Sequence, residues 1–206
     1  MTRAIIIGVD FDNTIVCYDA VFHRVAVEQG LVPAEVPATK TAVRDHLRRA
    51  GKEAAWTELQ GVVYGPRIAE AGAFPGVKEF FRECRMRGLP VKIISHKTRF
   101  PYAGTKHDLH AAAMIWLAKQ GFFAADGIGL STESVFFEAS KPEKLARIAA
   151  LGCSVFIDDL PEFLAEPDFP PAVRRVLFDP MGDQPAPSGI ESAPSWAAIG
   201  EKVFGA

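Results

Sequence analysis

An apolar run near the N-terminus ends in two aspartates, and this feature constrains the fold more than any other. Residues 4–9 are rich in β-branched side chains, which is typical of a buried strand, and Asp10 and Asp12 follow at once. Burying two carboxylates without partners is costly. We therefore expect the strand to deliver them to a solvent-accessible edge where a cation holds both. In open α/β sheets, ligands bind at the carboxyl ends of the strands.

The rest of the chain alternates between strand and helix patterns. Further strands are predicted at residues 91–95, 133–137, 154–157 and 175–178, with helices at residues 76–87, 108–119 and 141–151. Such alternation predicts a parallel sheet with right-handed crossovers, and hence an α/β fold with helices on both faces. The segment after Asp179 is rich in Pro, Gly and Ser, so a surface loop is expected there, followed by a short helix near Trp196.

Between the first two predicted strands the patterns are helical only. Helices are predicted at residues 19–29, 39–50 and 53–63, and a further short helix follows Pro66. We therefore expect two parts, an α/β core of residues 1–16 and 74–206 and a helical cap of residues 17–73. The cap is expected to act as a lid over the site.

Composition restricts the class of protein. The 206 residues carry a net charge of −2, which gives no sign of a nucleic acid or an anionic membrane as partner. No apolar stretch reaches the length of a membrane span. The three cysteines are far apart, which argues against a disulfide framework and a cysteine zinc site. A cytoplasmic protein is expected, and its oligomeric state is left open.

Polar side chains follow four of the predicted strands. Besides the first pair of aspartates, Ser95 ends the second strand, Lys141 follows the third, and Asp158 with Asp159 ends the fourth. Because the carboxyl ends of parallel strands meet at one edge, these side chains are expected around a single crevice. Several carboxylates together suit a hard cation with oxygen ligands, Mg²⁺ before others.

These residue types suit phosphoryl transfer to a carboxylate. Asp10 is a competent nucleophile toward phosphorus, which gives an aspartyl-phosphate. Asp12 can serve as general acid to the leaving alcohol and as general base to the attacking water. An ammonium and hydroxyl groups can bind the phosphate oxygens. The candidates for phosphate binding are Ser95, Lys141, Thr14 and His96.

Four short motifs along residues 5–159 resemble the ordered motifs of the haloacid dehalogenase-like (HAD) superfamily of phosphohydrolases. They are Val9-Asp10-Phe11-Asp12-Asn13-Thr14, Ile94-Ser95, Lys141-Pro142 and Ile157-Asp158-Asp159. Phe74-Pro75-Gly76-Val77 also resembles the return from a cap insertion in that superfamily. The resemblance implies a Rossmann-like core with the first strand at its centre.

The resemblance also implies roles at the site. Asp10 would be the nucleophile and Asp12 the acid and base. Mg²⁺ would be held by Asp10, by the main-chain carbonyl of Asp12 and by the Asp158-Asp159 pair. Asp159 is favoured as the direct ligand, although the sequence leaves that choice open. Superfamily dehalogenases lack an acid two residues after the nucleophile, and a halide needs no proton, so Asp12 favours a phosphatase over a dehalogenase.

The sequence as a whole predicts a Mg²⁺-dependent phosphatase acting on a small phosphorylated metabolite of unnamed identity. A phosphomutase and a non-catalytic protein that binds a phosphorylated ligand remain alternatives. A phosphatase of nucleic-acid ends is disfavoured by the near-neutral charge. An EF-hand is excluded, because Ile15 and Val21 stand where that loop needs Gly and Glu.

Two groups of basic residues are weaker candidates for substrate contact. Lys40, Arg44 and Arg48 recur every four residues, and a solvated helix face is favoured over an anionic ligand there. For the loop after Ser95, the sequence favours substrate contact and an ordinary surface loop equally. Its basic and aromatic residues are Lys97, Arg99, Tyr102, Lys106 and His107.

Overall fold

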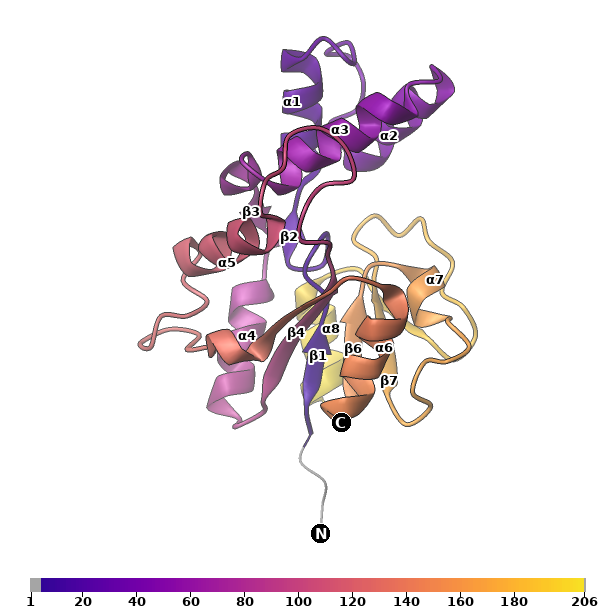
Figure 1. Cartoon of the computed structure of the whole chain (residues 1–206). Helices are drawn as coiled ribbons and strands as arrows, with labels where there is room; N and C mark the ends of the chain where they lie inside the picture. Colours follow the sequence, from indigo (N-terminus) through magenta and orange to yellow (C-terminus); the bar gives the residue numbers. More distant parts are fainter. Residues whose placement is uncertain (1–4, 206) are drawn as a thin grey trace. The chain divides into compact units, whose positions relative to one another are not determined.

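The structure is a computed structural model that describes residues 5–205 (Figure 1). Ala4, the first residue of the predicted N-terminal run, lies outside these residues. Contacts divide the chain into two compact units. The core unit contains the described residues up to Ile15, Ala73–His96 and the chain from Gly121 onward. The helical unit contains Val16–Gly72 and Lys97–Gln120.

The core unit is built on a six-stranded sheet in the order β5-β4-β1-β6-β7-β8, with all neighbours parallel. The strands are β1 (Ile7–Val9), β4 (Val91–His96), β5 (Val135–Glu138), β6 (Val155–Asp158), β7 (Arg174–Phe178) and β8 (Glu191–Ala193). β1 lies between β4 and β6, and all three of its residues are buried. This confirms the predicted parallel α/β fold, because a strand buried on both faces needs an apolar run and not an alternating one.

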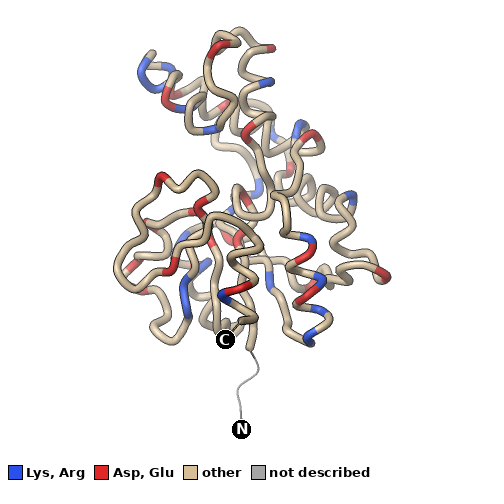
Figure 2. Tube along the Cα trace, turned by 180° about the vertical axis from the view of Figure 1, so that it is seen from behind, with Lys and Arg blue, Asp and Glu red and all other residues tan. Residues whose placement is uncertain are grey.

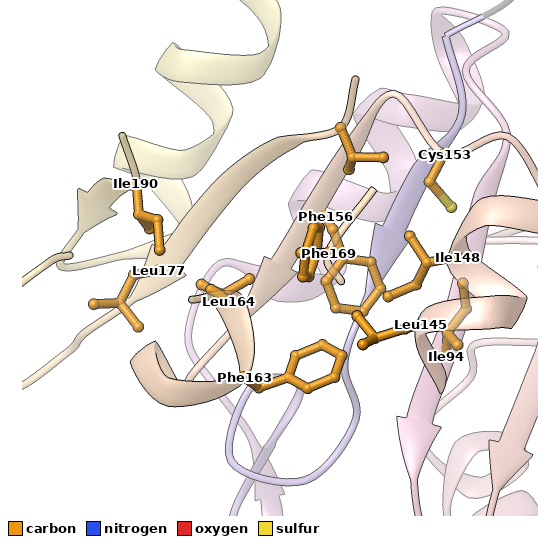
Figure 3. Packing of buried hydrophobic residues seen from close by; sticks show 11 residues of the cluster. Ile94, Leu145, Ile148, Cys153, Phe156, Phe163, Leu164, Phe169, Leu177 and Ile190 are labelled. Atoms are coloured by element: carbon orange, nitrogen blue, oxygen red, sulfur yellow. The ribbon is translucent and has the colours of Figure 1, made fainter. Parts of the chain in front are cut away.

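Helices cover both faces of this sheet. They are α4 (Val77–Met86), α6 (Lys141–Ala150), α7 (Pro161–Leu164) and α8 (Trp196–Phe204), with a 3₁₀ turn, η2 (Thr132–Ser134), before β5. The hydroxyls of Ser140 and Ser195 cap α6 and α8 by accepting from backbone N–H groups three residues on. On one face α6 and α7 enclose an apolar cluster in which Phe156 of β6 packs beside Phe163 of α7 (Figure 3).

α4 and α8 pack against each other and, through α8, against β7 and β8. The Trp196 ring at the start of α8 lies 5.0 Å from Phe80 of α4 and 5.8 Å from Phe178 of β7. Since residues alternate in direction along a strand, Leu177 joins the cluster of α6 and α7 while Phe178 faces Trp196. The strand alternation thus builds two separate apolar layers around the sheet.

The helical unit contains α1 (Asp19–Glu28), α2 (Lys40–Arg49), α3 (Glu53–Tyr64), η1 (Ile68–Glu70) and α5 (Leu109–Lys119). Thr39 caps α2, and the predicted cap Asp108 accepts from the Ala111 N–H at 2.9 Å. Residues 97–120 were predicted to belong to the core, but contacts place them in the helical unit. The physical reason is visible at Trp116 of α5, whose buried Nε1–H donates to the Ala71 carbonyl at 2.9 Å.

Several short elements were absent from the sequence prediction, among them α7 and η2. β8 lies within the segment expected to be a loop, and β2 (Val16–Cys17) pairs with β3 (Gly72–Ala73) in a separate two-stranded sheet. β3 (Gly-Ala) and β8 (Glu-Ser-Ala) contain no β-branched or large apolar residue that would mark a strand in the sequence. Among the described residues, no helix has the length and apolarity needed to cross a membrane.

Candidate active site

The turn after β1 presents the first aspartate at the carboxyl edge of the sheet. The Asp10 N–H donates to the Ile157 carbonyl at 2.9 Å, which continues the pairing with β6, and the residue is 5% exposed. Asn13 adopts a left-handed conformation with φ of 62°, which asparagine tolerates better than most residues. The turn then brings Thr14 back into the protein, where it is fully buried.

A lysine lies between the acids that follow β1 and β6. The Lys144 Nζ is 2.6 Å from Asp10 Oδ1 and 2.6 Å from Asp158 Oδ2, and all three side chains are buried. The same ammonium lies 4.1 Å from the centroid of the Phe163 ring. Lys144 is therefore held by two carboxylates and an aromatic face, within contact distance of the proposed nucleophile.

Lys141 was predicted to bind the phosphate, and the structure does not support this. Its Nζ pairs with Glu166 at 3.2 Å, and both side chains are at least 32% exposed. Lys141 is the first residue of α6, whereas Lys144 shares the buried face of that helix with Leu145 and Ile148.

Asp158 and Asp159 are held in place by different donors. Asp158 is fully buried, and its Oδ1 accepts from the Leu160 N–H at 2.9 Å. Asp159 Oδ1 accepts from the Thr14 hydroxyl at 3.0 Å. The hydroxyl proton of Thr14 is thus committed to a carboxylate, so this residue orients Asp159, and its predicted phosphate contact is not supported. The Thr14 carbonyl in turn accepts from Trp196 Nε1 at 3.2 Å.

One oxygen each from Asp10, Asp158 and Asp159 lie within 4.8 Å of one another, which is a spacing that a metal ion can bridge. When all three carboxylates are ionised and Lys144 is protonated, the group has a net charge of −2. A divalent cation with a preference for oxygen ligands fits this set of donors. Burial raises the pKa of Asp10 to about 7, the Lys144 ammonium opposes the rise, and Asp158 and Asp12 add to it.

The pKa of Lys144 is displaced upward. Burial of the ammonium works against its charged form, but the Asp10 and Asp158 carboxylates outweigh that effect and raise the pKa above the usual value for lysine. The amine is therefore protonated throughout the physiological range. It acts as a fixed positive charge beside Asp10 and not as a proton donor.

The other predicted residues have separate positions. Ser95 is buried near the end of β4, in register with Phe137 of β5. His96, the next residue, is exposed, and its Nε2 lies 3.2 Å from the Ala139 carbonyl, so its predicted phosphate contact gains no support. Asp12 is half-buried in the turn after Asp10.

The three basic residues of α2 that recur every four residues make two kinds of contact. Arg44 pairs with Asp45 at 2.8 Å, and Arg48 pairs with Glu53 at 2.9 Å through side chains more than 50% exposed. These two residues fit the solvated helix face that the sequence favoured. Lys40 instead lies against aromatic rings of the same unit. Acidic and basic residues are interspersed along the chain (Figure 2).

No protein-family model matches the chain, and no curated protein matches its sequence. Solved structures match over nearly the whole length. A haloacid dehalogenase-like hydrolase from Burkholderia xenovorans has a TM-score of 0.57 and 14% identity, covering 97% of this chain and 96% of that one. The fold is that of the haloacid dehalogenase-like superfamily.

Two further HAD structures show the range of proteins that share this fold. A HAD family hydrolase from Deinococcus radiodurans, solved with bound phosphate and sodium, has a TM-score of 0.55 and 14% identity, covering 98% of this chain and 96% of that one. An L-2-haloacid dehalogenase has a TM-score of 0.55 and 14% identity, covering 98% and 99%. At such identities the HAD likeness concerns the fold alone.

Proposed function

We propose that the chain is a Mg²⁺-dependent phosphatase that hydrolyses phosphate monoesters through an aspartyl-phosphate on Asp10. The observation that carries this proposal is the buried contact of Asp10 with Lys144 at 2.6 Å, inside a group of three acids, with Asp12 two residues along the chain. The fixed ammonium helps keep the Asp10 carboxylate ionised, as a nucleophile requires.

Asp10 and Asp12 divide the chemistry. An Asp10 oxygen attacks phosphorus, the bond between phosphorus and the ester oxygen breaks, and Asp12 gives its proton to the departing alcohol. A water oxygen then attacks phosphorus, Asp12 takes the water proton, and the Asp10 carboxylate leaves with release of inorganic phosphate. Ser95 is the hydroxyl proposed to donate to a phosphoryl oxygen.

Asp10, Asp159 and the Asp12 carbonyl are the groups proposed to hold Mg²⁺. Asp159 is favoured over Asp158 as the direct ligand, because both oxygens of Asp158 already accept N–H donors, at 2.6 and 2.9 Å. Bound Mg²⁺ supplies positive charge that offsets the negative charge of the phosphate.

Dehalogenation is the second candidate, because several proteins with this fold are dehalogenases. Two features favour phosphate. A halide leaves without a proton, so a dehalogenase has no use for Asp12. A dehalogenase also has no use for three clustered acids that suit a divalent cation.

The test is release of inorganic phosphate from a generic phosphate ester, measured with and without Mg²⁺. We expect Asp10→Asn to lower the rate by about a thousandfold or more, because the nucleophile is lost. Asp126→Asn is the matched control, since it makes the same chemical change at an exposed position of the core unit. EDTA should abolish the activity, and added Mg²⁺ should restore it.

Three outcomes would count against the phosphatase. Halide release from 2-chloropropionate without phosphate release would favour a dehalogenase. Transfer of the phosphate to a second hydroxyl, without free phosphate, would favour a phosphomutase. Binding of phosphate esters without turnover would favour a non-catalytic protein.

A further inference from the structure

Two hydrogen bonds connect the indole of Trp196 to the acidic group of the site through one residue, Thr14. Trp196 is the first residue of α8 and is 1% exposed. Its Nε1–H donates to the Thr14 carbonyl at 3.2 Å, from a position 182 residues further along the chain. The Thr14 hydroxyl donates to Asp159 Oδ1 at 3.0 Å. All three residues belong to the core unit, so this connection lies within one compact unit.

The indole is held in place by the residues around it. Its ring lies 5.0 Å from Phe80 and 5.8 Å from Phe178, measured between ring centroids. The backbone at Gly76 passes so close that a Cβ added there would lie 3.1 Å from the Trp196 Cβ. A buried indole N–H needs an acceptor, and a ring enclosed in this way can point its N–H in few directions. Trp196 therefore presents a donor of fixed position to the Thr14 carbonyl.

The peptide group between Thr14 and Ile15 is held at both of its polar atoms. Its carbonyl accepts from Trp196, and its N–H, which belongs to Ile15, donates to the Phe11 carbonyl at 3.0 Å. Threonine is β-branched, so its χ1 angle has few choices once the backbone is fixed. Holding this peptide group thus restricts the direction of the Thr14 hydroxyl, and with it the direction of the Asp159 carboxylate.

We propose that Trp196 is a positioning residue for the metal site, and that its indole N–H orients Asp159 through Thr14 and thereby raises the affinity for Mg²⁺. This inference rests on the proposed function, in which Asp159 is a direct ligand of Mg²⁺. Loss of a hydrogen bond that holds a metal ligand typically weakens metal binding about 10–100-fold. Trp196 acts on the ligand through a second residue, so its loss should have a smaller effect, about three- to fivefold.

Calorimetric titration with Mg²⁺ compares the wild type with Trp196→Phe, which keeps an aromatic ring beside Phe80 and Phe178 but has no N–H. The Kd for Mg²⁺ should rise about three- to fivefold. Trp116→Phe is the matched control, because Trp116 is also buried and donates to the Ala71 carbonyl at 2.9 Å within the helical unit. Both variants lose a buried indole donor, so an equal rise in the Kd of the control would overturn the proposal.

A double substitution tests whether Trp196 acts through Thr14. Thr14→Val removes the hydroxyl that contacts Asp159, and without that hydroxyl the indole has nothing to orient. The Kd of the double variant for Mg²⁺ should therefore match that of Thr14→Val within about twofold. A rise equal to the product of the two single effects would mean that the residues act independently, and would overturn the proposed connection.

If Trp196→Phe does not fold, a measurement on the wild type replaces it. By thermodynamic linkage, a contact that strengthens Mg²⁺ binding is itself strengthened by Mg²⁺. Saturating Mg²⁺ should therefore shift the NMR signal of the Trp196 indole N–H and leave that of Trp116 in place. An unmoved Trp196 signal would overturn the proposal.

The outcomes separate this inference from the proposed function. If Mg²⁺ binding depends on Trp196 but the wild type hydrolyses no phosphate ester, the phosphatase proposal fails and the positioning role stands. If the wild type hydrolyses esters with Mg²⁺ while Trp196→Phe binds Mg²⁺ with unchanged affinity, the positioning role fails and the phosphatase proposal stands. A wild type that binds no Mg²⁺ would overturn both.

Discussion

Replacing Lys144 by methionine should destabilise the core unit strongly. The substitution keeps most of the length of the side chain and its packing against Phe163, but it removes the charge that lies 2.6 Å from both Asp10 and Asp158. Two buried carboxylates are then left without their ammonium partner. Breaking a buried ion pair in this way typically costs about 3–5 kcal/mol in the free energy of unfolding.

Lys141→Met provides an internal reference on the same helix. Lys141 pairs with Glu166 through side chains 40% and 32% exposed, and water screens such a contact. Its loss should cost about 1 kcal/mol or less. The two variants carry the same chemical change three residues apart, so the difference in their unfolding free energies reports the environment of the ammonium.

The measurement is urea unfolding followed by circular dichroism. It is done in EDTA, because a bound metal ion would neutralise part of the negative charge that Lys144→Met leaves unpaired on Asp10 and Asp158. A chain of this length should lose about 10 °C in Tm for a destabilisation of about 3–5 kcal/mol. If the two variants unfold within 1 kcal/mol of each other, Lys144 does not sit between two ionised carboxylates, and the reasoning about the site is wrong.

Thr14→Val removes the hydroxyl that orients Asp159 and should weaken Mg²⁺ binding about tenfold, while Thr14→Ser should retain it; titration calorimetry with Mg²⁺ measures both. An equal affinity in the valine variant would mean that the hydrogen bond to Asp159 has no role in holding metal. Gly8→Ala would place a Cβ 2.4 Å from the Phe156 ring and should lower the unfolding free energy by about 1–3 kcal/mol. Gly72→Ala has open space around it and should change little, so equal thermal shifts would argue against this packing of β1.

The order of the elements could be predicted because periodicity and local signals agreed. The apolar run before Asp10 is the central strand, and the predicted cap Asp108 begins α5. The parallel sheet then follows from the alternation of strands and helices, and it brings Asp10, Asp158 and Asp159 together. Residue type and order were sufficient for these features, because each depends on contacts that a regular pattern encodes.

The lysine at the site could not be read from the motif alone. Lys141 and Lys144 are on one helix, and which of them faces the sheet depends on how α6 packs against β4 and β5. The grouping of residues 97–120 with the helical unit also depends on tertiary contacts, such as the bond from Trp116 to the Ala71 carbonyl. The apolar pattern of a single sequence predicts which face of a helix is buried, but not which other element packs against that face.

The helical unit is assembled from two separate stretches, and this restricts how it can be transplanted. A chimera that exchanges only Val16–Gly72 would leave α5 behind and would remove the Ala71 carbonyl that pairs with Trp116. Replacing the helical unit as a whole therefore requires both stretches to be moved together, with four junctions instead of two. The same coupling means that insertions or deletions in Lys97–Gln120 affect the helical unit as directly as changes in Val16–Gly72 do.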